Sequence, residues 1–441
     1  MRVGLIGSGG REHALARVLA HSPHPERLVV YSNTPNPGIR PLAGEWIKGS
    51  LNDAQAVARA MLAAHVDLVV VGPEAPLNAG AVDALRAAGI PSVGPTQSQA
   101  RLEGDKFFMR DLLQRRVGWG APQWCLARSR AEVLSFLDVV GEAAVKPLGL
   151  TGGKGVQVMG VHLRDAQEAA AYADTWIQKD GSVLLEERLV GEEFSRMAFA
   201  TDSGVFPMPV AQDFKYAYEG DQGLMTGGMG AYTMADGGMP FLLPDELAEA
   251  DRLMVETLAA LAEETGQPYR GMLYGQFMVT ARGVRLIEYN TRFGDPEAIN
   301  LCALLESDGV ELFSALAAGS LQVGQVRFAP QASLVKYLVP QAYPGPLPGD
   351  VYFDFDAARA RKAGFEVIVS SAALEDGRWK ALGSRALALV GLGEHPGALC
   401  EKLEALLSEM EPPELRHRRD IGAYATLESK TARMRALRPV L

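Results

Sequence analysis

Glu288 and Asn290 stand two residues apart behind an apolar stretch, and Arg292 follows at the same spacing. Because alternate side chains of a β-strand share a face, this spacing predicts that the three side chains point together. Mg²⁺ prefers carboxylate and amide oxygens, and a guanidinium offers a planar fork to a phosphate. The pattern therefore predicts a site for a magnesium-bound triphosphate. The alternative interpretation is a surface strand that ends in an ordinary turn at 294–296.

A glycine-rich turn, GSGGREH, follows the first predicted strand. Its Gly7, Gly9 and Gly10 let the backbone approach an anion closely, and the helix start that follows favours a phosphate. The turn therefore predicts a phosphate site, with a plain tight turn as the alternative. Nicotinamide dinucleotide binding is disfavoured, because the GxGxxG fingerprint requires glycine where Glu12 stands.

A second turn, GPEAPL at 72–77, follows another apolar strand. It falls at the carboxyl edge of the same predicted sheet, where ligands of doubly wound folds bind. Glu74 in this turn is a candidate for holding an amine or a hydroxyl group. The alternative is a carboxylate that only balances the start of a helix.

Glycines and lysines gather again in AAVKPLGLTGGKGV, after an earlier Lys106. The segment is no Walker A loop, since that loop opens a helix, whereas Gly155 leads into the β-branched run VQVM. We predict a hairpin lid that folds over a triphosphate, with lysines as point charges on the phosphates. The candidate residues of this lid are Lys146, Gly149, Gly152, Gly153, Lys154 and Gly155, and the earlier Lys106 is a further candidate for the phosphates.

The stretch VLLEERLVGEE at 183–193 combines a predicted strand with an acidic linker. A hinge that offers backbone amide and carbonyl groups between Glu186 and Leu189 is a candidate for reading adenine, and Glu193 is a candidate for the ribose hydroxyls. The alternative is a solvated acidic linker.

The order of elements predicts an α/β and α+β protein. Residues 1–100 alternate apolar runs at 3–6, 28–31, 67–71 and 91–94 with helical patterns at 11–20, 53–64 and 79–88. This alternation predicts a doubly wound domain with a parallel sheet. Residues 101–325 mix helices and strands and hold most of the polar candidates. Residues 326–441 predict a smaller C-terminal domain that opens with the strand at 333–340.

Composition excludes several classes of protein. The net charge is −10 and the pI is near 5.4, so no basic excess is available for general binding of nucleic acid or of membrane surfaces. Cys125, Cys302 and Cys400 lie far apart and predict neither a disulfide framework nor a zinc site. No apolar run approaches the length of a membrane span. We expect a cytoplasmic protein.

Taken together, these motifs resemble the ATP-grasp ligases and, among them, the glycinamide ribonucleotide synthetase family. The resemblance covers about the first 330 residues and rests on GSGGREHALA, VGPEAPL, GPT with LEGDK, KPLGLTGGKGV, EERLVGEE, AQDFK, TGGMGAY and EYNTRFGDPE. The C-terminal part matches more loosely, through YPG at 343–345 and RRDIG at 418–422. Such a member has an N-terminal sheet domain, an ATP-grasp core with a lid subdomain at about 118–192, and a small C-terminal domain.

The resemblance also implies a reaction. ATP would phosphorylate the carboxylate of glycine, and the amine of 5-phosphoribosylamine would displace phosphate to give glycinamide ribonucleotide. The resemblance implies that Mg²⁺ or Mn²⁺ assists this reaction. It also implies that the protein is a monomer or a weak dimer. Its implied roles fall on five groups: Lys106, Lys146, Gly152, Gly153, Lys154, Glu186, Leu189 and Glu193 for ATP; Glu288 and Asn290 for metal; Arg292, with Asp295 and Lys146, for phosphoryl transfer; Asp213, Lys215, Asp295 and the loop 226–230 with Gly227 and Gly228 for glycine; Gly9, Gly10, Arg11 and Glu74 for phosphoribosylamine.

Three departures from the family pattern keep alternatives open. The lid begins KPLG where many members have KADG, Leu224 and Met225 replace a Pro-Asn pair, and Phe214 stands where histidine is common. Asparagine supplies hydrogen bonds that methionine does not. The alternatives are an ATP-grasp ligase with another carboxylate or amine, and a nucleotide-binding relative without turnover.

Overall fold

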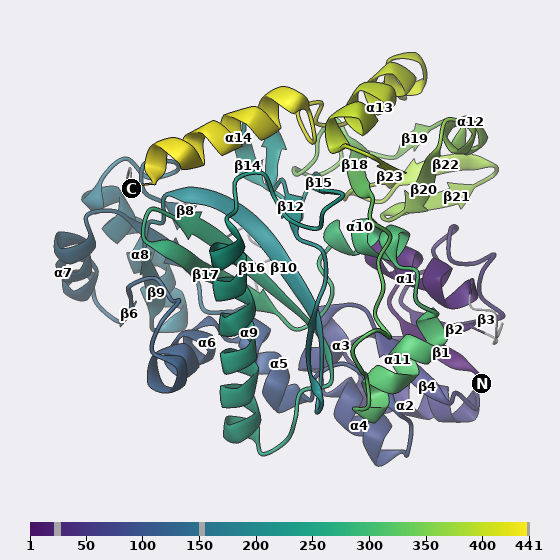
Figure 1. The fold of residues 1–441 in the computed structure, drawn as a ribbon, viewed down its shortest axis with the longest axis horizontal. Coiled ribbons are helices and arrows are strands. Elements are labelled where there is room, and N and C mark those ends of the chain that lie inside the picture. Colours follow the sequence, from purple (N-terminus) through teal and green to yellow (C-terminus); the bar gives the residue numbers. More distant parts are fainter. Residues whose placement is uncertain (22–27, 150–154, 439–441) are drawn as a thin grey trace.

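The computed structural model describes residues 1–21, 28–149 and 155–438 (Figure 1). The chain begins with a five-stranded parallel sheet of order β3-β2-β1-β4-β5. Three of its strands are short apolar runs buried along their whole length, as expected for a sheet covered on both faces. The strands are β1 (Val3–Ile6), β2 (Leu28–Ser32), β3 (Glu45–Lys48), β4 (Leu68–Val71) and β5 (Ser92–Val93).

The helices of this unit connect the parallel strands. They are α1 (Gly10–Ala20), α2 (Ala54–Ala63), α3 (Glu74–Asn78) and α4 (Ala81–Ala87). The four predicted strands and three predicted helices are confirmed, with ends that differ by one or two residues. The sequence analysis missed β3 and α3, because β3 is a partly exposed edge strand of mixed polarity and α3 is only five residues long.

A separate four-stranded sheet of order β6-β9-β7-β8 has a hydrophobic core of its own. Its strands are β6 (Trp124–Ala127), β7 (Ala143–Lys146), β8 (Gln157–Val158) and β9 (Val183–Glu187), with helices α7 (Arg130–Val140) and α8 (Ala166–Asp180). Ala144 of β7 pairs antiparallel with Val158 of β8, so the predicted hairpin is present. The lid candidates Gly152, Gly153 and Lys154 lie outside the described residues.

A ten-stranded sheet forms the centre of the molecule, along the path β17-β16-β10-β12-β15-β18-β23-β20. The predicted strand at 333–340 is β18, and it pairs with β15, so the sheet runs without a break into the C-terminal part of the chain. Its strands are β10 (Gly191–Thr201), β11 (Gly204–Pro207), β12 (Ala211–Asp213), β15 (Gly230–Thr233), β16 (Gly271–Thr280), β17 (Gly283–Asn290), β18 (Ala332–Pro340), β20 (Phe365–Val369), β23 (Leu387–Gly393) and β24 (Leu415–Arg416).

Helices and two small sheets surround this centre. The helices are α5 (Gln97–Gly104), α6 (Lys106–Leu112), a π-helical turn (Leu113–Val117), α9 (Pro244–Thr265), α10 (Glu297–Leu304), α11 (Gly309–Ala318), α12 (Ala357–Lys362), α13 (Pro396–Met410) and α14 (Tyr424–Leu437). The small sheets contain β13 (Tyr216–Tyr218) with β14 (Gln222–Met225), and β19 (Val351–Phe353) with β22 (Arg378–Ala381) and β21 (Ala372–Glu375).

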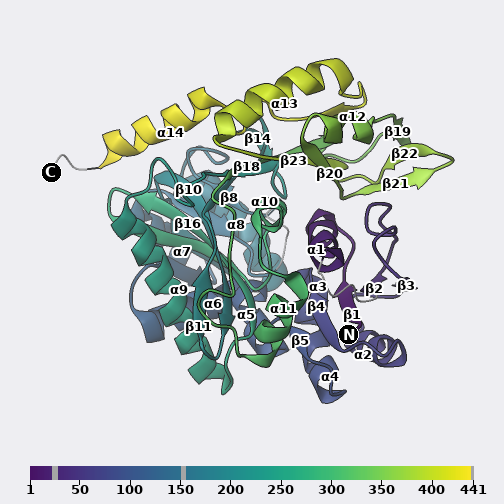
Figure 2. The same ribbon diagram turned by 45° about the vertical axis from the view of Figure 1, so that its right-hand side comes forward.

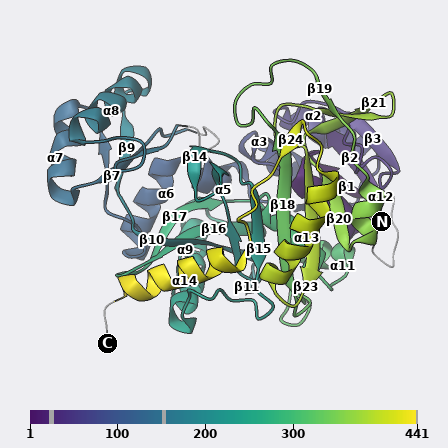
Figure 3. The same cartoon turned by 90° about the horizontal axis from the view of Figure 1, so that it is seen from above.

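Of the C-terminal elements, α12, β19, β20, β21 and β22 lie above α1 and the N-terminal sheet (Figure 2). The backbone amide of Val369 at the end of β20 donates to Nδ1 of His13 in α1 at 2.8 Å. Burial lowers the pKa of His13 to about 4, so this imidazole stays neutral and accepts the bond. Seen from above, α7 and α8 lie at one end of the molecule and the N-terminal sheet at the other (Figure 3). Among the described residues, no helix is long and apolar enough to span a membrane.

Candidate functional site

The site is built around the end of β17. Asn290 is the last residue of this strand, so Arg292 already belongs to the turn that follows. The turn nevertheless brings the two side chains together, with Nη2 of Arg292 donating to Oδ1 of Asn290 at 3.2 Å. Glu288 pairs with Gln276 on the neighbouring strand β16.

Two carboxylates hold Arg292 from the N-terminal side. Its Nη2 lies 2.9 Å from Glu103, and its Nε lies 3.4 Å from Glu74. Glu103 also accepts a hydrogen bond from the backbone amide of Thr291 at 2.8 Å, so it fixes both the turn and the guanidinium. The sequence analysis did not assign a role to Glu103, although it lies within the LEGDK motif.

Positive charge converges on Glu288. Burial favours the neutral form of this carboxyl, yet the surrounding cations outweigh burial and lower its pKa. Glu288 is therefore an ionised oxygen donor at neutral pH. The cations come from four separate segments of the chain and are Lys215, Lys146, Lys106 and Arg292.

Lys146 reaches this centre from the end of β7, and Lys106 reaches it from the start of α6. Nζ of Lys146 contacts the Glu186 carboxylate at 2.6 Å, and Nζ of Lys106 donates to the carbonyl of Gly149 at 2.9 Å. The fully buried Arg110 binds both oxygens of Glu186, at 2.7 and 2.9 Å. Burial opposes the charge of Glu186, but Arg110 and Lys146 hold its pKa down at about 2.

Residues 188–190 connect β9 to β10. They link the four-stranded sheet with the predicted lid hairpin, which we call the lid sheet, to the ten-stranded sheet, which we call the central sheet. The predicted adenine segment is thus a connection between two bodies of structure. The Glu186 side chain is occupied by its ion pairs with Arg110 and Lys146. Only its backbone groups are therefore available to an adenine ring. Leu189 is half-buried in this connection.

Glu193, Asp213 and Lys215 form a polar group beside Glu288. Nε2 of Gln276 donates to Glu193 at 2.8 Å and to Asp213 at 3.2 Å. Nζ of Lys215 lies 3.7 Å from Glu193 and 3.9 Å from Asp213. Burial raises the pKa of Asp213 to about 6, while Lys215 opposes that rise. The sequence analysis missed Gln276, which carries no motif signal.

The N-terminal turn is tied to the same centre. Arg11 donates to Glu12 at 2.6 Å and to the carbonyl of Phe293 at 3.0 Å. The amide of Gly9 donates to the Glu12 carboxylate at 2.6 Å. A Cβ on Gly10 would overlap the hydroxyl of Tyr337. Glycine at position 10 therefore has a packing reason that needs no ligand.

The loop 226–230 is joined to the turn after β17 by Arg385. Gly228 adopts φ +105°, a conformation that favours glycine. Arg385 donates to the carbonyls of Gly227 and Gly228, and it pairs with the Asp295 carboxylate at 3.1 Å. No motif in the sequence indicated Arg385.

Two of the three departures from the family pattern concern apolar side chains that make none of these polar contacts. Leu224 and Met225 belong to β14, and the Leu224 side chain is exposed. Phe214 is buried and packs against Tyr232, with ring centroids 6.2 Å apart. The Phe214 ring is thus a core side chain between Asp213 and Lys215.

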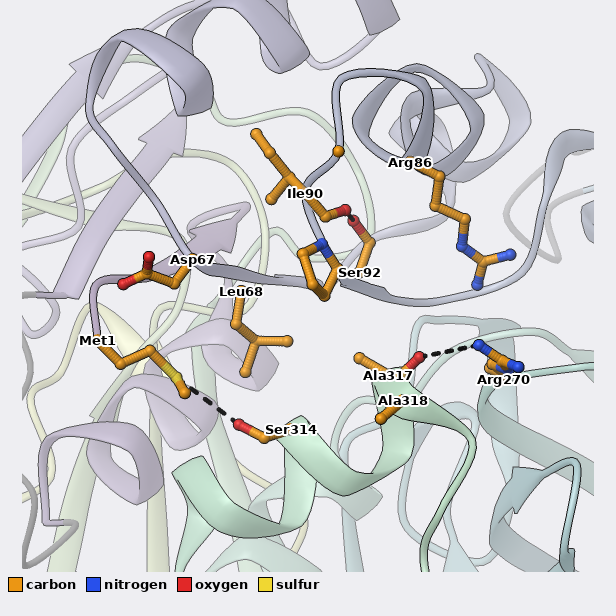
Figure 4. Close-up of a pocket in the computed structure, with 12 residues that line it drawn as sticks. Met1, Asp67, Leu68, Arg86, Ile90, Ser92, Arg270, Ser314, Ala317 and Ala318 are labelled. Carbon is orange, nitrogen blue, oxygen red and sulfur yellow. Dashed lines mark hydrogen bonds between the residues drawn. The ribbon is translucent and has the colours of Figure 1, made fainter.

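A cavity of about 450 Å³ lies elsewhere, between the amino ends of β4 and β5 and helix α11 (Figure 4). Its Arg270 is neutralised by Asp202 and donates to the carbonyl of Ala317 at 3.3 Å. None of the described residues predicted for the site lines this cavity. Ligands of doubly wound sheets bind at the carboxyl ends of the strands, where the turns at 7–10 and 72–74 lie.

Comparison with known families covers most of the chain. Residues 1–103 match the phosphoribosylglycinamide synthetase N domain, and residues 104–298 match the phosphoribosylglycinamide synthetase ATP-grasp (A) domain. A phosphoribosylamine–glycine ligase from Methanopyrus kandleri is 40% identical over 99% of both chains. One from Methanothermobacter thermautotrophicus is 42% identical over 99% of this chain and all of the relative.

Solved structures agree in fold. The crystal structure of phosphoribosylamine–glycine ligase from Thermotoga maritima superposes with a TM-score of 0.78 at 24% identity, covering 96% of this chain and 100% of that one. The biotin carboxylase domain of the Hydrogenobacter thermophilus 2-oxoglutarate carboxylase superposes with a TM-score of 0.71 at 15% identity, covering 98% and 93%. The expected architecture, with an N-terminal parallel sheet ahead of an ATP-grasp core, is confirmed.

The Glu186 ion pairs predict a large stability cost for Glu186→Ala. The substitution leaves buried Arg110 without its carboxylate, which typically costs about 3–5 kcal/mol. We expect the apparent melting temperature to fall by several degrees in differential scanning calorimetry. Because the folded-state pKa of Glu186 lies below its ordinary value, this contribution is present at neutral pH and is lost as the pH falls toward about 2.

Glu142→Ala is the matched control in the same lid sheet. Glu142 pairs with Arg188 at 2.6 Å, but its side chain is 52% exposed. Exposed pairs contribute about 1 kcal/mol or less, so this variant should melt close to the parent. Equal melting temperatures for the two variants would contradict a structural role for the buried pairs.

Proposed function

The chain belongs to the phosphoribosylamine–glycine ligase family, and on that premise we propose that it joins glycine to 5-phosphoribosylamine with consumption of ATP. This is a ligation of purine biosynthesis. The observation that carries the proposal is the full-length similarity to the ligases of Methanopyrus kandleri and Methanothermobacter thermautotrophicus. The cations gathered around Glu288 and Asn290 support it, because a polyphosphate needs such a field.

Glu288 and Asn290 would hold Mg²⁺, with Mn²⁺ as the other hard cation that suits the same oxygens. The fit is chemical: one ionised carboxylate and one amide oxygen suit a metal whose remaining ligands are phosphate and water. Within 1–21, 28–149 and 155–438, no group of three or more His, Cys, Asp and Glu side chains is arranged to hold a metal ion. The metal would neutralise phosphate charge during transfer.

The nucleotide would lie between the lid sheet and the central sheet. Lys106 and Lys146 would contact its phosphates, and Gly152, Gly153 and Lys154 would close over them. The backbone between Glu186 and Leu189 would read adenine. Glu193 would accept the ribose hydroxyls, since its side chain is 39% exposed at the start of β10.

Glycine would lie between the loop 226–230 and β12. Asp213 would accept the glycine ammonium group, while Lys215 and Gly227 with Gly228 would surround its carboxylate. That carboxylate attacks the γ-phosphorus of ATP and ADP leaves, giving glycyl phosphate. Arg292 would stabilise the charge that moves during this transfer, so the protein contributes positioning and electrostatics rather than a covalent step.

The second half-reaction needs phosphoribosylamine beside the glycyl group. Its amine attacks the acyl carbon, phosphate leaves, and a proton is lost from nitrogen. Gly9, Gly10 and Arg11 would receive the ribose phosphate, and Glu74 would hold the amine. Arg292 lies 3.4 Å from Glu74, so the acceptor turn and the phosphoryl-transfer centre share one ion pair.

We infer that the chain has three units, at 1–100, at 101–325 with a lid at about 118–192, and at 326–441. We also propose that its partners are small molecules and include neither nucleic acid nor a membrane. The protein would be cytoplasmic and would be a monomer or a weak dimer.

The decisive assay is coupled ADP release with glycine and freshly prepared phosphoribosylamine. The proposal predicts ADP release that requires both substrates. Release with a different amino acid would indicate another ATP-grasp ligase. Nucleotide binding without ADP release would indicate a relative that has lost turnover.

Glu288→Gln should retain the fold and lose at least a hundredfold in kcat, because a neutral amide replaces the ionised oxygen donor. Asn290→Ala should behave similarly. Circular dichroism checks the fold, and titration with Mg²⁺ and Mn²⁺ checks the cause, since the metal concentration for half-activity should rise. If either variant keeps a kcat within a few fold of the parent, the assignment of these residues as metal ligands is contradicted.

The pKa of Asp213 predicts a pH dependence for glycine. An ionised Asp213 is the form that accepts an ammonium group, so kcat/KM for glycine should fall about tenfold per pH unit below about 6. Asp213→Asn should show low activity without this acid limb. The folded-state pKa lies above the ordinary value of 3.8, so protonation of Asp213 favours the folded state and its titration cannot explain the loss by unfolding. A flat profile between pH 5 and 7 would contradict the role.

A further inference from the structure

Arg385 reaches the candidate site from the C-terminal part of the chain, just before β23. Its side chain is only 12% exposed. Nη1 donates to the carbonyls of Gly227 at 2.7 Å, Gly228 at 3.0 Å and Asp295 at 2.9 Å. Nη2 lies 3.1 Å from the Asp295 carboxylate. One guanidinium therefore binds two loops that are far apart in sequence.

The two glycine carbonyls are consecutive, so Arg385 constrains the path of the loop 226–230. Both peptide oxygens must turn toward the same guanidinium, which the positive φ of Gly228 makes possible. The amide of Gly228 donates to the Thr226 hydroxyl at 3.0 Å, within the loop itself. Without Arg385, three backbone carbonyls at a largely buried position would lose their donor.

Tyr337 extends the arrangement to the N-terminal turn. Its hydroxyl donates to Oδ1 of Asp295 at 2.5 Å, and its ring lies 4.5 Å from the Arg385 guanidinium carbon. The same hydroxyl occupies the space where a Cβ on Gly10 would stand. Arg385, Asp295 and Tyr337 thus connect the C-terminal part, the loop 226–230, the turn after β17 and the N-terminal turn.

We propose that Arg385 is a positioning residue for the carboxylate substrate: it holds the loop 226–230 and Asp295 in the arrangement that receives glycine. The proposal rests on the proposed function, because that function assigns both segments to the glycine site. The guanidinium uses two nitrogens: Nη1 donates to the three carbonyls, and Nη2 contacts the Asp295 carboxylate. Lysine has one nitrogen with three hydrogens on a flexible chain, so it cannot make all four contacts.

Arg385→Lys and Arg385→Met test the proposal. We expect kcat/KM for glycine to fall at least tenfold in both, with the larger loss in the Met variant. Calorimetric ATP affinity should stay within about twofold of the parent, because Lys106, Lys146 and Glu193 do not contact Arg385. Tyr337→Phe removes the hydroxyl that bonds Asp295 and Ser370 but leaves Arg385 in place, so it should raise the KM for glycine less than Arg385→Lys does.

Arg359→Met is the matched control. Arg359 lies in α12 of the same C-terminal part and pairs with Glu409 at the surface, where its side chain is 44% exposed. This variant should keep the parent's dependence on both substrates. Circular dichroism and melting temperature are measured for every variant, and Arg385→Lys decides the question if Arg385→Met does not fold.

The parent protein separates the two hypotheses. Absence of glycine-dependent ADP release by the parent would contradict the proposed function. If the parent is active, a folded Arg385→Lys with parental kcat/KM for glycine would overturn the positioning role. Equal losses for glycine and ATP would also overturn it, because they would indicate general structural damage.

Discussion

Cations that must stand close together before their anionic ligand arrives repel one another, and this constraint organises the candidate site. Lys106, Lys146, Lys215 and Arg292 all act on Glu288. Like charges at such range destabilise the folded protein unless carboxylates compensate. Three of these cations have nearby carboxylates that compensate their charge. Glu186 pairs with Lys146, Glu193 and Asp213 pair with Lys215, and Glu103 and Glu74 pair with Arg292. The free protein can therefore hold a positive field in place.

The compensating carboxylates come from three parts of the fold, so charge balance and architecture are linked. Glu74 and Glu103 lie in α3 and α5 on the N-terminal side, Glu186 lies in β9 of the lid sheet, and Glu193 and Asp213 lie in β10 and β12 of the central sheet. Closing the site therefore requires all of these units to meet. A buried cation whose partner is missing costs several kcal/mol, which makes a partly assembled site unfavourable. Arg292 is the clearest case, because its two partners belong to the N-terminal side and its turn belongs to β17.

The sequence predicted the features that a local residue pattern encodes, namely the strands and the centre of the candidate site. Apolar runs of four or five residues identified the parallel strands, and the alternation of Glu288, Asn290 and Arg292 identified the centre. It did not predict partners that are distant in the chain. Glu103 and Arg292 are 189 positions apart, and Arg385 binds Gly227 from 158 positions away. No periodicity relates such pairs, since only the completed topology makes them neighbours. Gln276 was missed for the same reason, because a single glutamine inside a buried strand has no spacing to reveal its bonds to Glu193 and Asp213.

The N-terminal turn shows that the residues of one motif can be required for more than one physical reason. Gly9 and Gly10 were interpreted either as a close approach to phosphate or as a plain tight turn. The overlap that a Cβ on Gly10 would make with Tyr337 adds a third constraint from the C-terminal part of the chain. A larger residue at position 10 would displace Tyr337, and with it Asp295, before any effect on a phosphate was felt. Loss of activity on substituting Gly10 therefore cannot identify the acceptor site. Glu74 probes that site without crowding a neighbour, because its carboxylate is 40% exposed, and phosphoryl transfer must be measured alongside because Glu74 also pairs with Arg292.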